Sequence, residues 1–373
     1  MKSSFYTAAE ISAAGLGAFA EFCYLCRQIS TVMKLRHFLL TIAAAVCLGT
    51  TSAQELTWSV DFSSTFDNRE GDSANDQTIF FTRLVPEVGI ILPQGAGRIS
   101  GGVVWNQPVN NDWDDYQVIP TLYYRVERDA WRFNFGMFSR RYLMEEAPKF
   151  LWSDSIDYRQ PNVRGLLVQH VTDRGWAELM LDWRQIQTNT KREAFNVVLN
   201  SLWHPVASSP IYVGERLQYN HLAKQRHAPE EQGVNDDFMF NPFVGVNTTA
   251  LPLDSLGVRI GGVLSMQRQR SDSRGWRTRG GALVEANAHW RFLSLNETLY
   301  LGGNLMPLYP EFGPQLNMGS PYYQATTYSR TDLRAHIIRN RYVDLTAGLN
   351  LHITPDVCAL WQQITLRVYL GSK

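Results

Sequence analysis

From residue 55 to the end of the chain, apolar and polar residues alternate with a period of two. The alternation is clearest in residues 56–66, 116–127, 131–140, 255–266 and 363–370. Successive side chains of a β-strand point to opposite faces, so this period predicts strands with one apolar and one polar face. Several segments approach about ten residues, enough to cross a bilayer at a tilt, whereas strands of soluble proteins usually have about five or six. The pattern favours transmembrane strands over a soluble all-β fold.

The segments divide into about sixteen strands, with about fourteen as the main alternative. A bilayer offers no water to an open sheet edge, so the strands must close on themselves. We therefore expect an all-β fold, a transmembrane antiparallel up-and-down β-barrel formed by residues 54–373. Its strands are expected near residues 56–66, 79–92, 98–106, 116–127, 131–140, 164–171, 176–184, 194–203, 210–221, 238–248, 255–266, 278–291, 297–305, 331–339, 342–353 and 363–370.

The connections between these segments alternate in length. Even-to-odd joins such as 128–130, 172–175 and 292–295 are short, whereas odd-to-even joins such as 141–163 and 306–330 are mostly long. Outer-membrane barrels have short periplasmic turns and longer outer loops, so both termini are expected in the periplasm. Tryptophans near the strand ends are typical of the aromatic girdles at the headgroups: Trp58, Trp105, Trp131, Trp176, Trp183, Trp203 and Trp290.

A signal peptide is predicted ahead of the barrel. Lys34 and Arg36 follow Met33, residues 38–49 are apolar, and the small residues 51–53 end the segment. This order predicts a secretory signal over residues 33–53, cut after Ala53. Residues 1–32 are then an upstream extension that precedes the true start. The apolar run is too short for a spanning helix, which needs about 20 residues.

Cysteine and charge narrow the function further. After cleavage only Cys358 remains, as suits a chain exported to the oxidising periplasm. Cys23 and Cys26 form a pair, but no second pair accompanies it. The 35 basic and 35 acidic residues balance, so nothing favours nucleic acid. No phosphate-binding loop or metal-ligand motif is visible, and we expect no cofactor.

The polar face of the strands must line the lumen. A barrel of this width can hold an aqueous channel, and rings of charge select solutes. We therefore expect these pore-lining residues: Arg132, Arg140, Arg216, Arg259, Arg334, Arg367, Glu127, Asp182 and Glu285.

The long join 141–163 is acidic. It carries Glu145, Glu146, Asp154 and Asp157. One hypothesis is that this loop folds inward and forms a constriction opposite Arg132, Arg216 and Arg259. The other is that it stays on the surface, as most loops do.

The loop is similar in position and charge to the inward-folded third loop of general porins. Residues 54–373 as a whole resemble the porin-like outer-membrane barrels of Bacteroidota, and the Ala53–Gln54 junction resembles their signal cut. The resemblance implies passive diffusion of small hydrophilic solutes across the outer membrane. It also implies contact with outer-membrane lipid and lipopolysaccharide, and a homo-oligomer. On this basis the protein is expected not to be an enzyme.

Two other functions stay open. A barrel hydrolase acting on lipid or peptide needs a histidine with an acidic partner, and His221 and His227 lie near Asp236 and Asp237. A spacing of this kind is common by chance, and solvated loop residues are the favoured explanation. The second alternative is an outer-membrane scaffold for surface polysaccharide or secretion machinery.

Overall fold

The computed structural model describes residues 55–72, 76–109, 115–229, 232–249 and 252–372. The predicted signal peptide over 33–53 and the upstream residues 1–32 lie outside these ranges, so both stay predictions.

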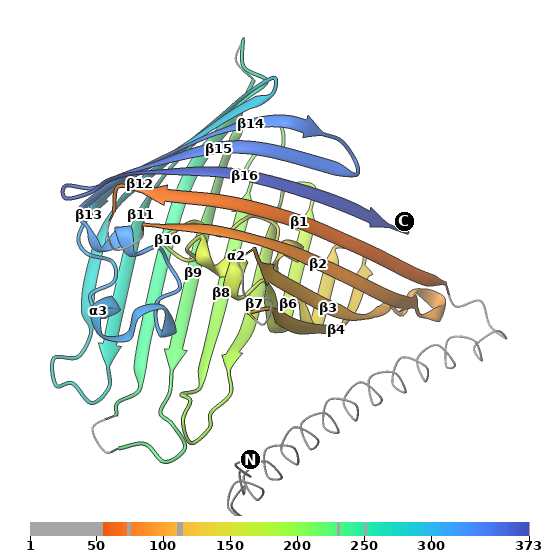
Figure 1. Ribbon diagram of the computed structural model, residues 1–373. Helices are drawn as coiled ribbons and strands as arrows, with labels where there is room; N and C mark the ends of the chain where they lie inside the picture. The colour runs from red at the N-terminus through yellow and green to blue at the C-terminus, as the bar shows by residue number, and fades with distance from the viewer. Residues whose placement is uncertain (1–54, 73–75, 110–114, 230–231, 250–251, 373) are drawn as a thin grey trace, which may run out of the picture. The chain divides into compact units, whose positions relative to one another are not determined.

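The described residues form a closed barrel of antiparallel strands in which each strand pairs with the next along the chain (Figure 1). The sixteen strands confirm the predicted barrel and its preferred strand number. They are β1 (Leu56–Glu70), β2 (Gln77–Ile91), β3 (Arg98–Pro108), β4 (Gln117–Arg128), β5 (Trp131–Ser139), β6 (Asn162–Thr172), β7 (Gly175–Gln185), β8 (Ala194–Trp203), β9 (Ile211–Leu222), β10 (Asn235–Thr248), β11 (Ser255–Gln269), β12 (Arg277–Trp290), β13 (Leu293–Gly302), β14 (Thr327–Arg339), β15 (Val343–Ile353) and β16 (Cys358–Gly371).

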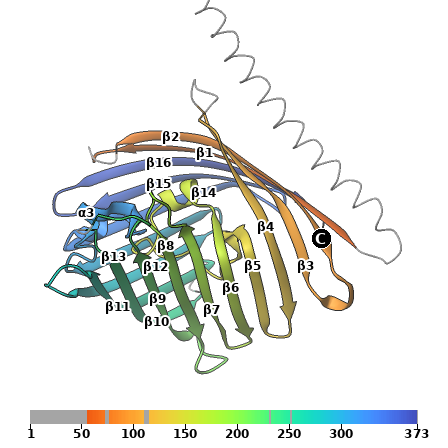
Figure 2. The same cartoon turned by 90° about the horizontal axis from the view of Figure 1, so that it is seen from below.

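The ring closes between the first and last strands. β1 pairs with β16 over a continuous register that includes Phe62 opposite Val368 and Phe66 opposite Ile364. Figure 2 shows β1 and β16 side by side in the wall. Closure leaves no strand edge with unpaired backbone groups, which is the condition for a sheet to cross a bilayer.

The two faces of the strands differ as the alternation predicts. Along β9, Tyr212, Arg216 and Gln218 are buried, whereas Ile211 and Val213 are exposed. The inner face is therefore polar or packed, and the outer face is apolar and meets lipid. Glu215 keeps the outward phase, opposite Ser201 and Pro242, so no bulge is needed to explain it.

Tight turns close one end of the barrel. Only Arg291 and Phe292 separate β12 from β13, and Arg291 has a left-handed φ of 54°. The prediction of a turn over 292–295 was wrong, because the two-residue turn lets β13 begin at Leu293. We call this end periplasmic and the end with the long loops outer.

Two long loops from the outer end fold into the lumen. The first, residues 140–161, contains η2 (Arg140–Tyr142) and α2 (Ser155–Arg159). The second, residues 303–326, contains α3 (Tyr309–Phe312), η3 (Gly313–Gln315) and η4 (Pro321–Gln324). A further short helix, η1 (Pro93–Gly95), lies between β2 and β3. None of the helices in the described ranges is long and apolar enough to cross a membrane.

The two inward loops carry apolar side chains that share one core with the inner wall. Their contributions are Phe150, Leu151, Trp152, Leu305, Met306, Met318 and Tyr323, and the wall adds Phe138, Met180, Met239 and Tyr300. We call this cluster the lumenal core. Burial of so many apolar groups fixes both loops inside the barrel. The expectation of an aqueous channel did not anticipate this packing.

Candidate functional site

A charged cluster lies on the outer face of the barrel, where β9, β10 and β11 approach the outer end. His221 on β9 is the register partner of Asp236 on β10. On β9, Gln218 and Asn220 are fully buried toward the lumen, so the alternating Tyr219 and His221 point outward. By the same alternation Asp236 faces outward, whereas the next residue, Asp237, faces inward.

Asp236 is the centre of this cluster. Its carboxylate accepts hydrogen bonds from the Tyr219 hydroxyl at 2.7 Å and from His221 Nδ1 at 3.0 Å. The Nε atoms of Arg268 and Arg270 each donate to it at 2.8 Å. The side chain of Asp236 is 0% exposed, because its four partners cover it. A carboxylate with this many charge-assisted partners is held in one orientation.

The imidazole of His221 is fixed on two sides. Asp236 holds Nδ1, and the ring of Phe195 stacks on it with centroids 4.8 Å apart. The side chain is 15% exposed, and within the described ranges Nε2 has no hydrogen-bond partner. A histidine held at Nδ1 with Nε2 free has the arrangement of a general base.

The cluster lies at the outer boundary of the apolar band. Along β8, Phe195 is eight residues from Trp203 at the periplasmic end, which corresponds to roughly 27 Å of strand. The apolar band of such barrels is about 25 Å tall. Trp183 and Trp276 are exposed near the same outer end, as expected of residues at the headgroup level. The cluster therefore meets the boundary between lipid tails and headgroups.

The chemistry available here is hydrolysis by an activated water. Among the described residues, no serine, threonine or cysteine hydrogen-bonds to His221, so the ring is placed to deprotonate water instead. Arg268 binds Asp236 through Nε and keeps other N–H groups that can stabilise a developing oxyanion. No group of three or more His, Cys, Asp or Glu side chains in the described ranges has metal-binding geometry.

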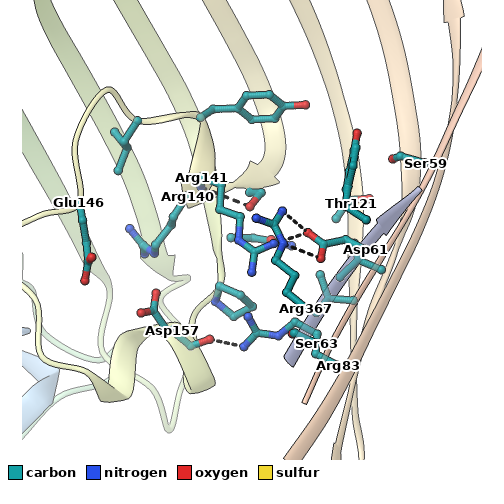
Figure 3. Close-up of a pocket in the computed structure, with 18 of the residues that line it drawn as sticks. Ser59, Asp61, Ser63, Arg83, Thr121, Arg140, Arg141, Glu146, Asp157 and Arg367 are labelled. Carbon is teal, nitrogen blue, oxygen red and sulfur yellow. Dashed lines mark hydrogen bonds and ion pairs between the residues drawn. The ribbon is translucent and has the colours of Figure 1, made fainter. Parts of the chain in front are cut away.

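A hollow lies inside the barrel. It has a volume of about 910 Å³ and lies between the loop 140–161 and the wall formed by the first and last strands (Figure 3). Asp61 pairs there with Arg141, and Arg367 donates to it at 2.7 Å. Arg83 donates to the backbone carbonyl of Asp157. The charged side chains that line this hollow are thus largely paired with one another.

Apart from Arg140, which begins the loop 140–161 in η2, the residues predicted to line a pore lie on the inner phase of their strands, and most of them pair internally. Arg216 binds Glu285 at 2.8 Å, and Arg140 binds Asp182. Glu127 lies 3.7 Å from Arg132. Arg334 and Arg367 line the interior hollow. Such pairs neutralise the inner wall.

The acidic residues of the loop are also paired. Glu145 lies 3.3 Å from Arg259, which is one of the three arginines expected opposite the loop. Glu146 binds Lys149 at 2.6 Å, and Asp154 binds Arg330 at 2.7 Å. Asp157 lines the interior hollow.

Of the four residues in the predicted histidine–acid group, the structure brings together only His221 and Asp236. Asp237 faces the lumen, where Asn220 and Gln267 donate to it at 2.7 and 2.8 Å. Among the described residues no hydrogen bond or ion pair joins His227 to either aspartate. Tyr219, Arg268 and Arg270 were not anticipated. The only sequence signal for them was their outward phase beside the histidine.

Comparison with solved structures shows the fold. OprD of Pseudomonas aeruginosa is similar with a TM-score of 0.51 at 8% identity, over 86% of this chain and 96% of that one. A loop-deletion variant of OmpT, an outer-membrane protein of Vibrio cholerae, gives 0.51 at 9% over 86% and 100%. The anion-selective porin of Comamonas acidovorans gives 0.50 at 9% over 85% and 99%. The chain thus has the fold of these outer-membrane β-barrels. No curated protein matches the sequence.

The family comparison corrects the expected function. Residues 48–360 match the model of the lipid A 3′-O-deacylase-type family, which covers most of the chain. The expectation of a porin for passive diffusion of small solutes was wrong, as was the expectation that the protein is not an enzyme. The alternation of apolar and polar residues predicts a barrel but does not distinguish a channel from an enzyme. This chain belongs to the lipid A 3′-O-deacylase-type family.

Proposed function

We propose that the protein hydrolyses an acyl ester of lipid A, with His221 and Asp236 as its catalytic pair. The observation that carries the proposal is the position of this pair on the lipid-facing wall at the outer end of the barrel. The family supports the reaction and the substrate class.

The location of the substrate requires an outward-facing site. Lipid A is a glycolipid whose ester bonds join the fatty acyl chains to the saccharide, at the boundary between hydrocarbon and headgroup. Its acyl chains stay in the bilayer, so the ester meets the outer wall of a barrel and not its lumen. His221 lies at that boundary, whereas the hollow in Figure 3 lies between the loop 140–161 and the inner wall.

The reaction follows from the arrangement of the side chains. Asp236 holds the His221 ring with the proton on Nδ1, so that Nε2 can accept a proton from water as the water oxygen bonds to the ester carbonyl carbon. The resulting oxyanion accepts hydrogen bonds from N–H groups of Arg268. The bond from this carbon to the sugar oxygen then breaks, and protonated Nε2 donates its proton to that oxygen. A free fatty acid and a sugar hydroxyl result.

The test is hydrolysis of lipid A by purified protein in detergent micelles, followed by mass spectrometry of the lipid. His221→Ala should lower the rate by at least roughly a hundredfold, the lower range for a general base. His227→Ala is the matched control, since His227 does not contact Asp236, and it should hydrolyse lipid A as the native protein does. Native activity in His221→Ala would refute the assignment.

A further inference from the structure

The hairpin between β11 and β12 is rich in arginine. Residues 268–279 contain Arg268, Arg270, Arg274, Arg277 and Arg279, and one acidic residue, Asp272. We call this segment the arginine hairpin. Five cations in so short a segment repel one another unless anions lie among them. The cations are therefore expected to have partners.

Two carboxylates are shared among four of these arginines. Asp236 binds Arg268 and Arg270, as described above. Asp272 binds Arg274 at 2.7 Å and Arg277 at 3.0 Å. Each carboxylate thus holds two guanidinium groups, and the segment with Asp236 keeps more positive than negative charge. Since a guanidinium has five N–H donors, sharing leaves donors free on each arginine.

Three of these arginines lie on the outward side or at the tip of the hairpin: Arg268 and Arg270 bind the outward-facing Asp236, and Arg274 lies in the turn. Arg277 and Arg279 are instead the register partners of Gln267 and Ser265, whose side chains are buried toward the lumen. Arg274 is 71% exposed at the tip of the hairpin. The guanidinium of Arg268 lies over the ring of Trp276, with its Cζ 4.3 Å from the ring centroid. This contact keeps the guanidinium plane in one orientation at the membrane boundary. Cations fixed by carboxylates and a ring lose little freedom when they bind an anion.

We propose that the arginine hairpin binds an anionic group, a phosphate or a carboxylate, on the saccharide of the lipid whose ester His221 hydrolyses. This inference rests on the proposed function. Arginine suits such a group because its planar fork donates two parallel hydrogen bonds to phosphate or carboxylate oxygens. Arg268 and Arg270 contact the same carboxylate as His221, so an anion held by the hairpin lies close to the reacting ester.

The proposal makes the hairpin a selectivity element. A lipid with an anionic saccharide is held with its ester near His221, whereas an uncharged glycolipid lacks this contact. Phospholipids carry a phosphate but no acylated sugar beside it, so they meet the hairpin without presenting an equivalent ester. The consequence is a preference for acylated, anionic saccharides over the bulk lipids of the membrane.

Binding is best measured separately from hydrolysis, on the His221→Ala protein in detergent micelles. The ligands are lipid A with its phosphates, the same lipid after enzymatic dephosphorylation, and dephosphorylated lipid A that carries an acidic core sugar. The first should bind at least roughly tenfold more tightly than the second, as expected for hydrogen bonds between charged groups. The third separates a carboxylate source from a phosphate source. Tighter binding of either anionic lipid than of the uncharged one supports the proposal.

Substitutions locate the contact. Adding Arg270→Gln and Arg274→Gln to the His221→Ala protein should remove most of the preference, and raised salt should weaken it in the parent. Arg341→Gln is the matched control, because Arg341 stacks on Tyr342 in the turn between β14 and β15 at the other end of the barrel. Heat-modifiable migration on a gel checks that each variant is folded.

The outcomes separate the two proposals. Equal binding of charged and uncharged lipids, or an unchanged preference in the doubly substituted hairpin, overturns the role of the hairpin. Hydrolysis by the native protein without any preference for anionic lipid leaves the catalytic assignment standing alone. Anion-dependent binding without any hydrolysis removes the catalytic assignment and keeps the binding site.

Discussion

His221 and Asp236 face each other across neighbouring strands, with Nδ1 and Oδ1 3.0 Å apart on the lipid-facing side of the barrel. The residues beside them, Asn220 and Asp237, make a parallel contact of 2.7 Å on the lumenal side. The same pair of strands thus carries polar contacts on both faces. Only the outer contact can meet a lipid, and several predictions depend on it.

Replacing Asp236 with Asn removes the charge that holds the imidazole. Asparagine can present its amide NH₂ to Nδ1 and favour the wrong tautomer, so we expect kcat for lipid A hydrolysis to fall roughly a hundredfold or more. Glu215→Gln is a control on the same lipid-facing wall and should keep native kcat. Equal rates for Asp236→Asn and the native protein would show that Asp236 does not orient the base.

The hydroxyl of Tyr219 donates to Asp236 at 2.7 Å. Tyr219→Phe removes this hydrogen bond and keeps the ring, which should lower kcat about three- to tenfold, in line with about 1 kcal/mol for one hydrogen bond. KM should change little, because the other contacts of Asp236 remain. The measurement is a steady-state comparison of kcat and KM; a loss confined to KM would instead indicate that Tyr219 contacts the substrate.

The lumenal core should block ion flow. Phe150, Leu151 and Met306 are fully buried between the two inward loops and the wall. We expect purified protein in a planar bilayer to give no steady ohmic conductance. A stable conductance comparable to that of an open porin of similar strand number would contradict the packing of these loops.

The inward position of the loop 140–161 should depend on acid. Burial alone would raise the pKa of the Asp154 carboxyl, but Arg330 and Lys149 outweigh it and hold the pKa well below its usual range. A carboxyl whose pKa is lower in the folded loop than in the unfolded chain stabilises the folded loop above its unfolded pKa, about 3.9. That stability is lost as pH falls toward the pKa of the folded state. Fluorescence of Trp152 should therefore change reversibly only below about pH 4.

Asp154→Asn is the matched variant for this measurement. It removes the titrating group, so its Trp152 fluorescence should show no acid transition. At neutral pH the fluorescence of the variant should already differ from that of the native protein, because the loop has lost the ion pairs of Asp154. An acid transition that persists unchanged in the variant would assign the titration to another carboxyl.

The architecture was predictable because lipid imposes it. Each strand has an apolar face and a polar face, as in β9 with Ile211 and Val213 on one side and Arg216 and Gln218 on the other. In a bilayer, a closed ring exposes the apolar face to lipid, encloses the polar face and pairs every backbone group. The packing of Phe150, Leu151 and Trp152 was harder to predict, although three large apolar residues in a loop are themselves a sign of burial. The acidic residues beside them drew the interpretation toward a channel constriction.

The candidate site was only partly predictable. His221 and Asp236 flank one loop, so their proximity could be expected from sequence. Arg268 lies on the next strand, and its contact with Asp236 requires the register between β10 and β11, which alternation alone does not give. Hydrolysis of lipid was only an alternative in the sequence analysis, because a lipid-facing histidine looks the same in the pattern as a histidine at the end of any strand.

Adjacent aspartates on β10 serve opposite sides of the wall, Asp236 toward lipid and Asp237 toward the interior. A slip of that strand by one position relative to β9 would exchange them. The shifted chain could still form a closed barrel. Asp236 would then face the lumen, and Asp237 would face the acyl chains of the lipid. Natural length variation in the loop 223–234 should therefore leave the order of polar and apolar residues within β10 unchanged, because the loop absorbs the extra residues.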